Sequence, residues 1–292
     1  MLAAAASCIP TALLADVEPL TLYQKTARAP LVVKARALSD STRRPQMEVL
    51  EIFKGSYPAK TLTIAPHFED NTRPMPWLKR EVFRRGEESI LFLSPYLDEF
   101  GRDEGPDTFE LLNADQGKVG IPAEGGDALV EALRRFVSIQ SLGQHDKQGE
   151  ALRGMLRQQN PHLLEAGLTE CRKFHLAEPE DAETLVGLIA HPRPEFRATA
   201  LELLGQIVKR AQEKGSPAPA PTLAGGSVFE RIAAAGRLDA HPMVRRQAIG
   251  ALEAFADTPA LLVIEAIGRS DASQDVRYEA QVAAYRLRER TR

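Results

Sequence analysis

The pentapeptide CRKFH holds a thiol and an imidazole, Cys171 and His175, at a spacing that suits metal chemistry. Residues four apart share one face of a helix, so both side chains could bind one zinc ion, with His162 and Glu178 as the nearest further ligands. Cys171 also falls at an apolar position of a helical pattern, where a small buried thiol is the commoner role. We therefore predict a core cysteine, and no metal site, catalytic residue or cofactor.

The rest of the sequence lacks the motifs of common enzyme chemistry. HExxH, GxSxG, the phosphate-binding GxxxxGK loop and the dinucleotide-binding GxGxxG pattern are absent. The 37 basic and 40 acidic side chains give a net charge of −3, which provides no broad attraction for nucleic acid. No run of eighteen apolar residues is present, so we expect no transmembrane helix in the mature chain.

The first fifteen residues, MLAAAASCIPTALLA, carry no charge. Ala5 and Ser7 place small side chains three and one positions before Cys8, as cleavage by a signal peptidase requires. The stretch AASC resembles the box of bacterial lipoproteins, which implies a lipid on Cys8. We expect residues 1–19 to be an export signal and the protein to be periplasmic or on the cell surface, either free or tethered by that lipid. A non-functional tail on a cytoplasmic protein is the alternative.

The stretch AHPMVRRQAIGALEAF, residues 240–255, is one of four segments that align along the chain. One aligned position holds Leu164, Arg197, Arg245 and Arg277. The position three places earlier holds Pro161, Pro194, Pro242 and Gln274, and the position one place earlier holds Leu163, Phe196, Val244 and Val276. Apolar or small residues recur three, seven and ten places later, which keeps them on one helical face. Proline fits the first turn of a helix because its missing N–H is not needed there.

The aligned positions lie 33, 48 and 32 residues apart. The long interval contains the Pro, Ala and Gly-rich stretch KRAQEKGSPAPAPTLAGGS, which predicts a flexible insertion over about residues 211–227. Without it, the period is typical of helical-pair repeats. A second apolar helix is expected before each aligned one, over residues 146–157, 180–190, 227–238 and 259–269. Residues 145–292 are therefore predicted to form about four stacked helical hairpins.

The turn DAHPMVR, Asp239 to Arg245, resembles the Asp-x-x-Pro-x-Val-Arg turn of HEAT repeats, particularly short bacterial ones related to phycobilisome lyase subunits. DASQDVR and HPRPEFR match it in part, and QQNPHLL lacks both the acid and the arginine. The resemblance implies an interaction scaffold for an unidentified protein partner, and a lyase-like enzyme role is one alternative. We interpret Arg197, Arg245 and Arg277 as structural, because five planar donors suit turns and neighbouring carboxylates. A ligand-binding ladder is the other interpretation.

In residues 20–122 the apolar residues are spaced differently from those of the helical repeats. LVVKARAL, QMEVLEIFKG, KTLTIA, ESILFLS and FELLNADQGKVGI are short segments rich in Val, Ile, Leu or Phe, which is typical of strands. KGSYPAK predicts a turn between the second and third, and NADQGK predicts a turn inside the fifth. Five or six strands without helical crossovers predict a small antiparallel barrel that is closed or nearly closed and OB-like.

The order of EVLEIFKG, KTLTI and RRGEESILFLSP resembles the barrel of netrin-like modules and tissue inhibitors of metalloproteinases. That resemblance implies inhibition of an extracellular or periplasmic protease, which is a further alternative for function. The inhibitors use a free cysteine at the mature amino terminus. Cys8 stands about twenty residues before the first strand and the disulfide cysteines of that family are absent, so inhibition does not carry over to this chain.

The loop at residues 66–87 contains the single tryptophan, Trp77. We expect Trp77 and Phe83 to plug one end of the barrel, since aromatic side chains supply much buried area, and a binding loop is the alternative. A connecting helix is predicted over 123–144 with Asp127 as its cap. The sequence thus predicts a multi-domain α and β protein, an OB-like barrel followed by a HEAT-like solenoid, that acts as a non-enzymatic protein–protein interaction scaffold.

Overall fold

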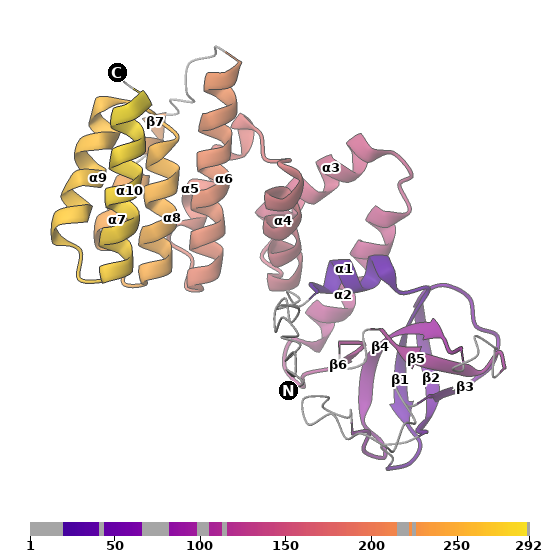
Figure 1. Ribbon diagram of the computed structural model, residues 1–292. Helices are drawn as coiled ribbons and strands as arrows, with labels where there is room; N and C mark the ends of the chain where they lie inside the picture. Colours follow the sequence, from indigo (N-terminus) through magenta and orange to yellow (C-terminus); the bar gives the residue numbers. More distant parts are fainter. Residues whose placement is uncertain are drawn as a thin grey trace, which may run out of the picture. The chain divides into compact units, whose positions relative to one another are not determined.

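The computed structural model describes residues 20–40, 44–65, 82–97, 105–112, 116–214, 222–223 and 226–290. The chain divides into two compact units, Met1–Gly126 and Asp127–Arg292, coloured from indigo to magenta and from magenta to yellow in Figure 1. The predicted export signal at residues 1–19 lies outside the described residues. Within the described ranges, no helix combines the length and the apolar character needed to cross a membrane.

The first unit contains a small closed barrel, as the alternating sequence pattern predicts. Its strands are β1 (Leu31–Ala37), β2 (Gln46–Lys54), β3 (Thr61–Ile64), β4 (Glu88–Pro95) and β5 (Thr108–Leu111). Neighbouring strands follow the order β1-β2-β3-β5-β4, and β4 also pairs with β1, so the sheet closes on itself. This five-stranded closure is the OB-like barrel expected from the sequence.

Alternate side chains of the strands fill the barrel. Val33 and Ala35 of β1 are fully buried, whereas Lys34 and Arg36 beside them are partly exposed. Phe83 is 2% exposed and belongs to the same core cluster, as the plug interpretation predicts. Trp77, the other expected plug residue, lies outside the described residues.

One pairing differs from the antiparallel pattern that the sequence predicts. β3 and β5 are parallel, with Thr63 opposite Thr108, because the barrel closes through strands that no hairpin connects. The fifth predicted segment is divided into β5 and β6 (Lys118–Gly120), in agreement with the turn predicted inside it, and both strands pair antiparallel with β4. The chain returns to β4 at Gly117, where a Cβ would lie 2.5 Å from the Leu112 nitrogen, so only glycine allows this approach.

Two helices flank the barrel strands in sequence. α1 (Leu22–Arg28) is not predicted by the sequence pattern, because its seven residues are too few to show a period. Thr21 and Gln24 fix its start through a capping box. α2 (Gly126–Gln140) is the predicted connecting helix, but Asp127 lies in its first turn instead of capping it, because the helix already begins at Gly126.

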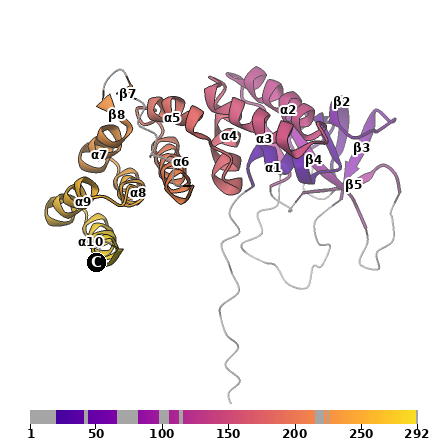
Figure 2. The ribbon, with the colours of Figure 1, turned by 90° about the horizontal axis from the view of Figure 1, so that it is seen from above.

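Over the described residues, the second unit continues as four helical hairpins. The first helices are α3 (His145–Gly154), α5 (Ala182–Leu188), α7 (Val228–Leu238) and α9 (Thr258–Ser270). The second helices are α4 (Pro161–Phe174), α6 (Pro194–Glu213), α8 (Pro242–Glu253) and α10 (Gln274–Arg290). Short 3-10 turns follow α3 (Met155–Arg157) and precede α5 (Pro179–Asp181). Figure 2 shows α6, α8 and α10 on the inner side of an arc, with α5, α7 and α9 outside.

One apolar core connects the hairpins. Phe196, Val244 and Val276 are at most 3% exposed and belong to a single cluster, as their alignment predicts. Leu163 is the exception, because it is buried outside that cluster and Leu164 contributes in its place. The aligned position is arginine in the other three hairpins, whereas a leucine there is apolar and joins the core.

The predicted insertion at 211–227 begins inside a helix, because α6 continues to Glu213. At its other end β7 (Thr222–Leu223) pairs with β8 (Gly226–Ser227), directly before α7. Residues 215–221 and 224–225 lie outside the described residues.

Candidate interaction surfaces

The three aligned prolines begin helices. Pro161, Pro194 and Pro242 are the first residues of α4, α6 and α8, where the chain has no intrahelical use for an N–H. The residue before two of them acts as the cap, since Asn160 accepts a hydrogen bond from the backbone N–H of His162, and His241 accepts one from Met243. These positions therefore fix where α4, α6 and α8 start.

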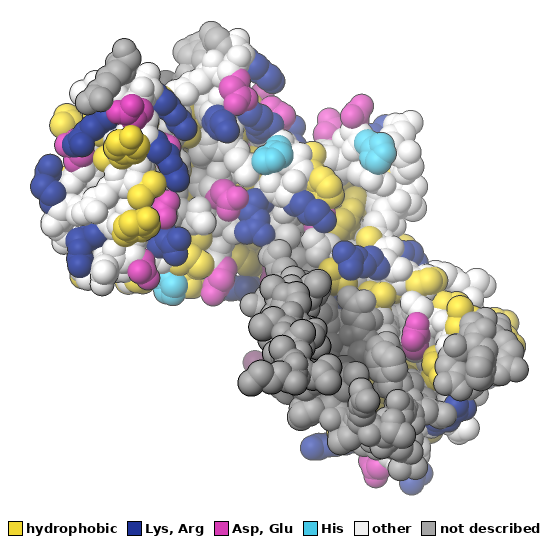
Figure 3. Space-filling model, in the orientation of Figure 1, with side chains coloured by type: hydrophobic (Ala, Val, Ile, Leu, Met, Phe, Trp, Pro, Cys, Tyr) yellow, Lys and Arg dark blue, Asp and Glu magenta, His cyan; other side chains and the backbone are white. Residues whose placement is uncertain are grey.

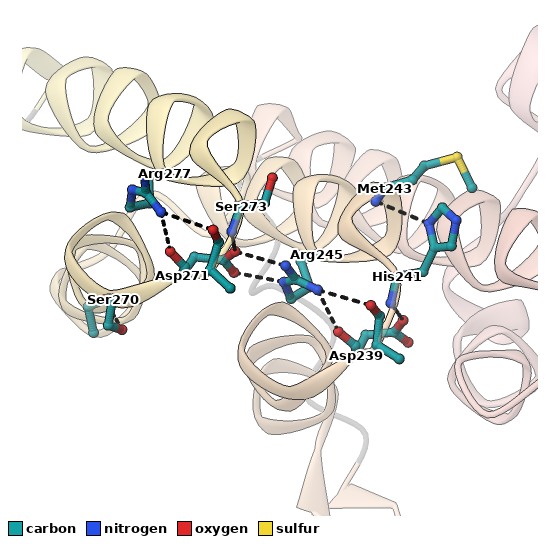
Figure 4. Close-up of polar contacts among 11 residues, drawn as sticks. Asp239, His241, Met243, Arg245, Ser270, Asp271, Ser273 and Arg277 are labelled. Atoms are coloured by element: carbon teal, nitrogen blue, oxygen red, sulfur yellow. Dashed lines mark hydrogen bonds and ion pairs between the residues drawn. The ribbon is translucent and has the colours of Figure 1, made fainter.

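The aligned arginines form a ladder along the hairpins, and Figure 4 shows its central rung. Nη1 of Arg245 donates to the carbonyl oxygens of Asp239 and Ala240, at 2.8 and 3.3 Å, and so holds its own turn. Its other edge, Nε and Nη2, donates to both carboxylate oxygens of Asp271 in the next hairpin, at 2.7 and 2.8 Å. Arg245 thus fixes one turn and joins it to the following hairpin.

Arg197 repeats the arrangement one hairpin earlier. Its Nη1 donates to the carbonyls of His191 and Pro192, and its Nε and Nη2 donate to Asp239, both at 2.8 Å. Arg277 holds its own turn in the same way, through the carbonyls of Asp271 and Ala272 at 2.6 and 3.2 Å. Within the described part of the chain, no carboxylate accepts from Nε or Nη2 of Arg277.

The rungs are largely shielded from solvent. The side chains of Arg245 and Asp271 are 10% and 5% exposed. The hydrogen bond from Arg245 is the main reason that the pKa of Asp271 lies below its ordinary value. Burial acts to raise the pKa of Asp239, but the bonds from Arg197 and the backbone N–H of His241 outweigh it and the pKa is lowered. Both carboxylates are therefore ionised and paired near neutral pH.

The first junction uses a different set of partners, which the sequence alignment does not reveal. Asp181 is fully buried and accepts from Arg153 Nε at 2.7 Å and from Arg157 Nη2 at 2.9 Å. Arg153 lies in α3 and Arg157 in the 3-10 turn that follows it, so neither belongs to the aligned column, where Leu164 stands. In the sequence, only the spacing of four between Arg153 and Arg157 hints at a shared acidic partner. Arginines with this spacing are also common on solvent-exposed helices, so the pattern does not predict the contact with Asp181.

The inner side of the arc carries charges that pair between neighbouring second helices. Arg172 lies 4.0 Å from Glu202, Arg246 lies 3.8 Å from Glu279, and Arg286 lies 3.5 Å from Glu253. Figure 3 shows basic and acidic side chains interspersed over the helical unit. Partly exposed pairs of this kind add little stability, but they occupy the charged groups that a ligand would otherwise meet.

A distinct surface lies on α10, which Figure 2 shows at one end of the arc. Tyr278 and Tyr285 are 67% and 64% exposed, and they stand one and eight places after Arg277. Gln281 between them is also exposed. We call these four residues, with Arg277 included, the outer face of α10.

A groove of about 860 Å³ lies between α2, α3 and α4. Its lining residues include the buried Met155 and Leu163 and several exposed charged side chains. The charged residues of both signs are Glu131, Arg134, Arg135, Lys147 and Glu150. Asn160 Nδ2 donates to the carbonyl of Ala128 at 2.8 Å, which fixes the start of α4 on α2.

Cys171 and His175 are not placed to bind one metal ion together. Cys171 is fully buried in the hairpin core, as its place in the apolar column predicts, and burial raises the pKa of its thiol to about 12. His175 is exposed and ends α4 in the left-handed conformation, with φ of 53°. Among the described residues no group of three His, Cys, Asp or Glu side chains is placed to hold a metal ion. Cys8 lies outside the described residues.

Alkylation by iodoacetamide at pH 8 should leave Cys171 unmodified in the folded protein. A rise in thiol pKa from about 9 to about 12 lowers the thiolate fraction about a thousandfold, and burial blocks access as well. Peptide mass spectrometry follows Cys171, and a sample in urea serves as the control that reacts quickly. Because the folded pKa is the higher one, the thiol's contribution to stability is complete below pH 9 and declines as the pH rises towards 12. Rapid labelling of the folded protein would contradict the core assignment.

No protein-family model and no curated protein matches this chain. Among solved structures, the complex of CpcE and CpcF of phycocyanin lyase from Nostoc sp. is similar to it, at 14% identity and a TM-score of 0.37. The match covers 53% of this chain and 98% of that chain. The stacked hairpins are compatible with the resemblance to HEAT repeats, and a likeness this distant says nothing about function.

Proposed function

We propose that this protein is a non-enzymatic interaction scaffold that binds a polypeptide segment in the groove between α2, α3 and α4. The groove itself is the observation that carries the proposal. It combines buried apolar residues with exposed charges of both signs in about 860 Å³. Small-molecule sites are mostly apolar, with few polar groups. A peptide with apolar side chains between charged ones matches this lining better than a small metabolite does.

The walls of the groove are held in place before any ligand binds. Besides the bond from Asn160 to α2, Gln148 Nε2 donates to the carbonyl of Gln140 at 3.3 Å and joins the start of α3 to the end of α2. Asn160 Nδ2 also reaches the carboxylate of Glu131 at 3.3 Å. A surface that is already ordered loses less conformational entropy on binding, which favours a binding role.

A photoreactive amino acid at Ser138 tests the proposal in the native host. Ser138 is exposed and lines the groove, so we expect it to form adducts with one or a few discrete polypeptides. The matched control carries the same amino acid at Glu183, which is exposed on α5 and does not line the groove. Ala151→Glu adds a charge to the groove and should lower the Ser138 adduct about tenfold. Identical adducts from both positions, or none from Ser138, would refute the proposal.

Export belongs to the same proposal and is supported by the uncharged amino-terminal sequence alone. We expect mass spectrometry of the protein from its native host to find a mature chain that begins at Cys8, and the mass of that residue decides between the tethered and the free form. Cleavage without a lipid would leave an exported, untethered scaffold. An intact Met1 in the soluble cytoplasmic fraction would contradict export. Assignment of the hairpins to HEAT repeats and of the barrel to netrin-like modules is likewise proposed, on the turn motifs and the strand landmarks.

A further inference from the structure

The outer face of α10 has the features of a stacking surface. We propose that it binds a helical hairpin of a different protein, whose turn between helices presents a carboxylate to Arg277. This inference deepens the proposed scaffold role and rests on it. It concerns a second surface, separate from the groove in sequence and in its lining residues.

The first argument is the unused edge of Arg277. In Arg197 and Arg245 the same edge, Nε with Nη2, binds both oxygens of an aspartate in the next hairpin. Arg277 is held in the same way by two carbonyls of its own turn, so its guanidinium is already fixed. A planar pair of donors in a fixed orientation selects a carboxylate, and it does so most strongly where both oxygens can accept.

The second argument is what the preceding hairpins do with the positions of Tyr278 and Tyr285. In the first hairpin the equivalent residues pair with α6 or its cap, since Glu165 lies 3.9 Å from Arg193 and Arg172 lies 4.0 Å from Glu202. In the third, the equivalents Arg246 and Glu253 pair with side chains of α10.

The second hairpin uses these positions for close packing. Ala198 is buried, and a Cβ on Gly205 would lie 3.0 Å from the Cα of Ala251 in α8. Both positions thus face the following hairpin in all three earlier cases. In α10 they hold two exposed tyrosines, a residue type that is enriched in protein interfaces.

A second copy of this chain does not fit the same surface. The carboxylates that the described hairpins present at this place are those of Asp181, Asp239 and Asp271, and each is already held by arginines of its own chain. A symmetric antiparallel pairing of two α10 helices about Gln281 and Val282 would place Arg277 opposite Arg286, with like charges together. The partner is therefore a different protein, with an acidic turn and a second helix that accommodates two tyrosine rings.

Replacement of Tyr285 by benzoylphenylalanine provides the probe, because it keeps an aromatic side chain at the exposed position. Irradiation in the native host is expected to give an adduct that maps, by sequencing of the cross-linked peptide, to a helical segment next to an Asp or Glu turn. Arg277→Gln should reduce the adduct about tenfold, through loss of a hydrogen-bonded ion pair. Arg277→Lys keeps the charge but not the planar pair of donors, so it should give an intermediate loss and guards against misfolding of the first variant.

The Ser138 probe in the groove serves as the matched control. If Arg277→Gln removes the Tyr285 adduct and leaves the Ser138 adduct unchanged, the assignment of the outer face of α10 as a binding surface holds. An adduct with a second copy of this chain, an adduct unaffected by both Arg277 variants, or no adduct at all would overturn it. If the Ser138 adduct persists in those cases, the scaffold proposal stands without this surface. If neither the Ser138 probe nor the Tyr285 probe gives an adduct while Arg277 is intact, the scaffold proposal and the proposal for the outer face of α10 are both overturned.

Discussion

Replacing Asp271 with alanine is expected to lower the free energy of unfolding of the helical unit by about 3–5 kcal/mol. Asp271 is the acceptor for both outer donors of Arg245, and the two side chains are only 5% and 10% exposed. Its removal leaves a shielded guanidinium without a counter-charge, which costs more than the ion pair itself contributes. Asp271 also accepts from the backbone N–H of Ser273, so the turn before α10 loses a hydrogen bond as well.

Urea unfolding of the full chain, followed by circular dichroism at 222 nm, measures this change. Asp257→Ala is the matched control, because Asp257 caps α9 through the N–H of Ala260 and pairs with no arginine in the described part of the chain. It should cost about 1 kcal/mol. Equal losses for the two variants would show that the ladder contributes no more than an ordinary cap. Asp271→Asn keeps an oxygen that can accept from Ser273 and should fall between them.

Gly205→Leu is expected to destabilise the helical unit by about 3 kcal/mol, through separation of α6 from α8. A Cβ at this position already meets the Ala251 Cα at 3.0 Å and its Cβ at 3.4 Å, and the obstacle is partly backbone, which cannot rotate away. A larger side chain forces the two helices apart and exposes the core between them. The loss exceeds the gain in helix propensity that removal of a glycine brings.

Gly250→Ala is expected to change the free energy of unfolding in the opposite direction and to stabilise the helical unit. Gly250 lies in α8, is exposed, and a Cβ there would meet nothing within 4 Å. We therefore expect a gain of about 0.5–1 kcal/mol from propensity alone. The same urea titration measures both variants. A neutral or stabilising Gly205→Leu would mean that the two helices are less closely packed than the Gly205 and Ala251 approach requires.

Periodicity made the hairpins predictable. Phe196, Val244 and Val276 recur at one position of a helical face, and the prolines mark where each second helix begins, so element type, order and core could be inferred together. Both signals are local, since each depends on residues within one or two turns of a helix. The strand segments of the barrel were predictable for the same reason.

Long-range pairing was not predictable from these signals. Arg197 binds Asp239 across 42 residues, and the insertion between them hides the fact that Arg245 and Asp271 are the equivalent pair. The parallel pairing of β3 with β5 likewise depends on how the barrel closes, which strand patterns do not encode. The burial of Leu164 instead of Leu163 in the shared core follows from the loss of arginine at one position.

The ladder also determines how the helical unit responds to a pulling force. Each rung joins a hairpin only to the one that follows it, so separating α9 and α10 from the other hairpins breaks the contact of Asp271 with Arg245 together with the shared apolar core and the ion pairs between α8 and α10. Once all of these contacts break, the load passes to the next junction, which contains the contact of Asp239 with Arg197. Such a repeat unit unfolds stepwise from its loaded end. The hairpins that the break has not yet reached stay folded until their own junction is loaded.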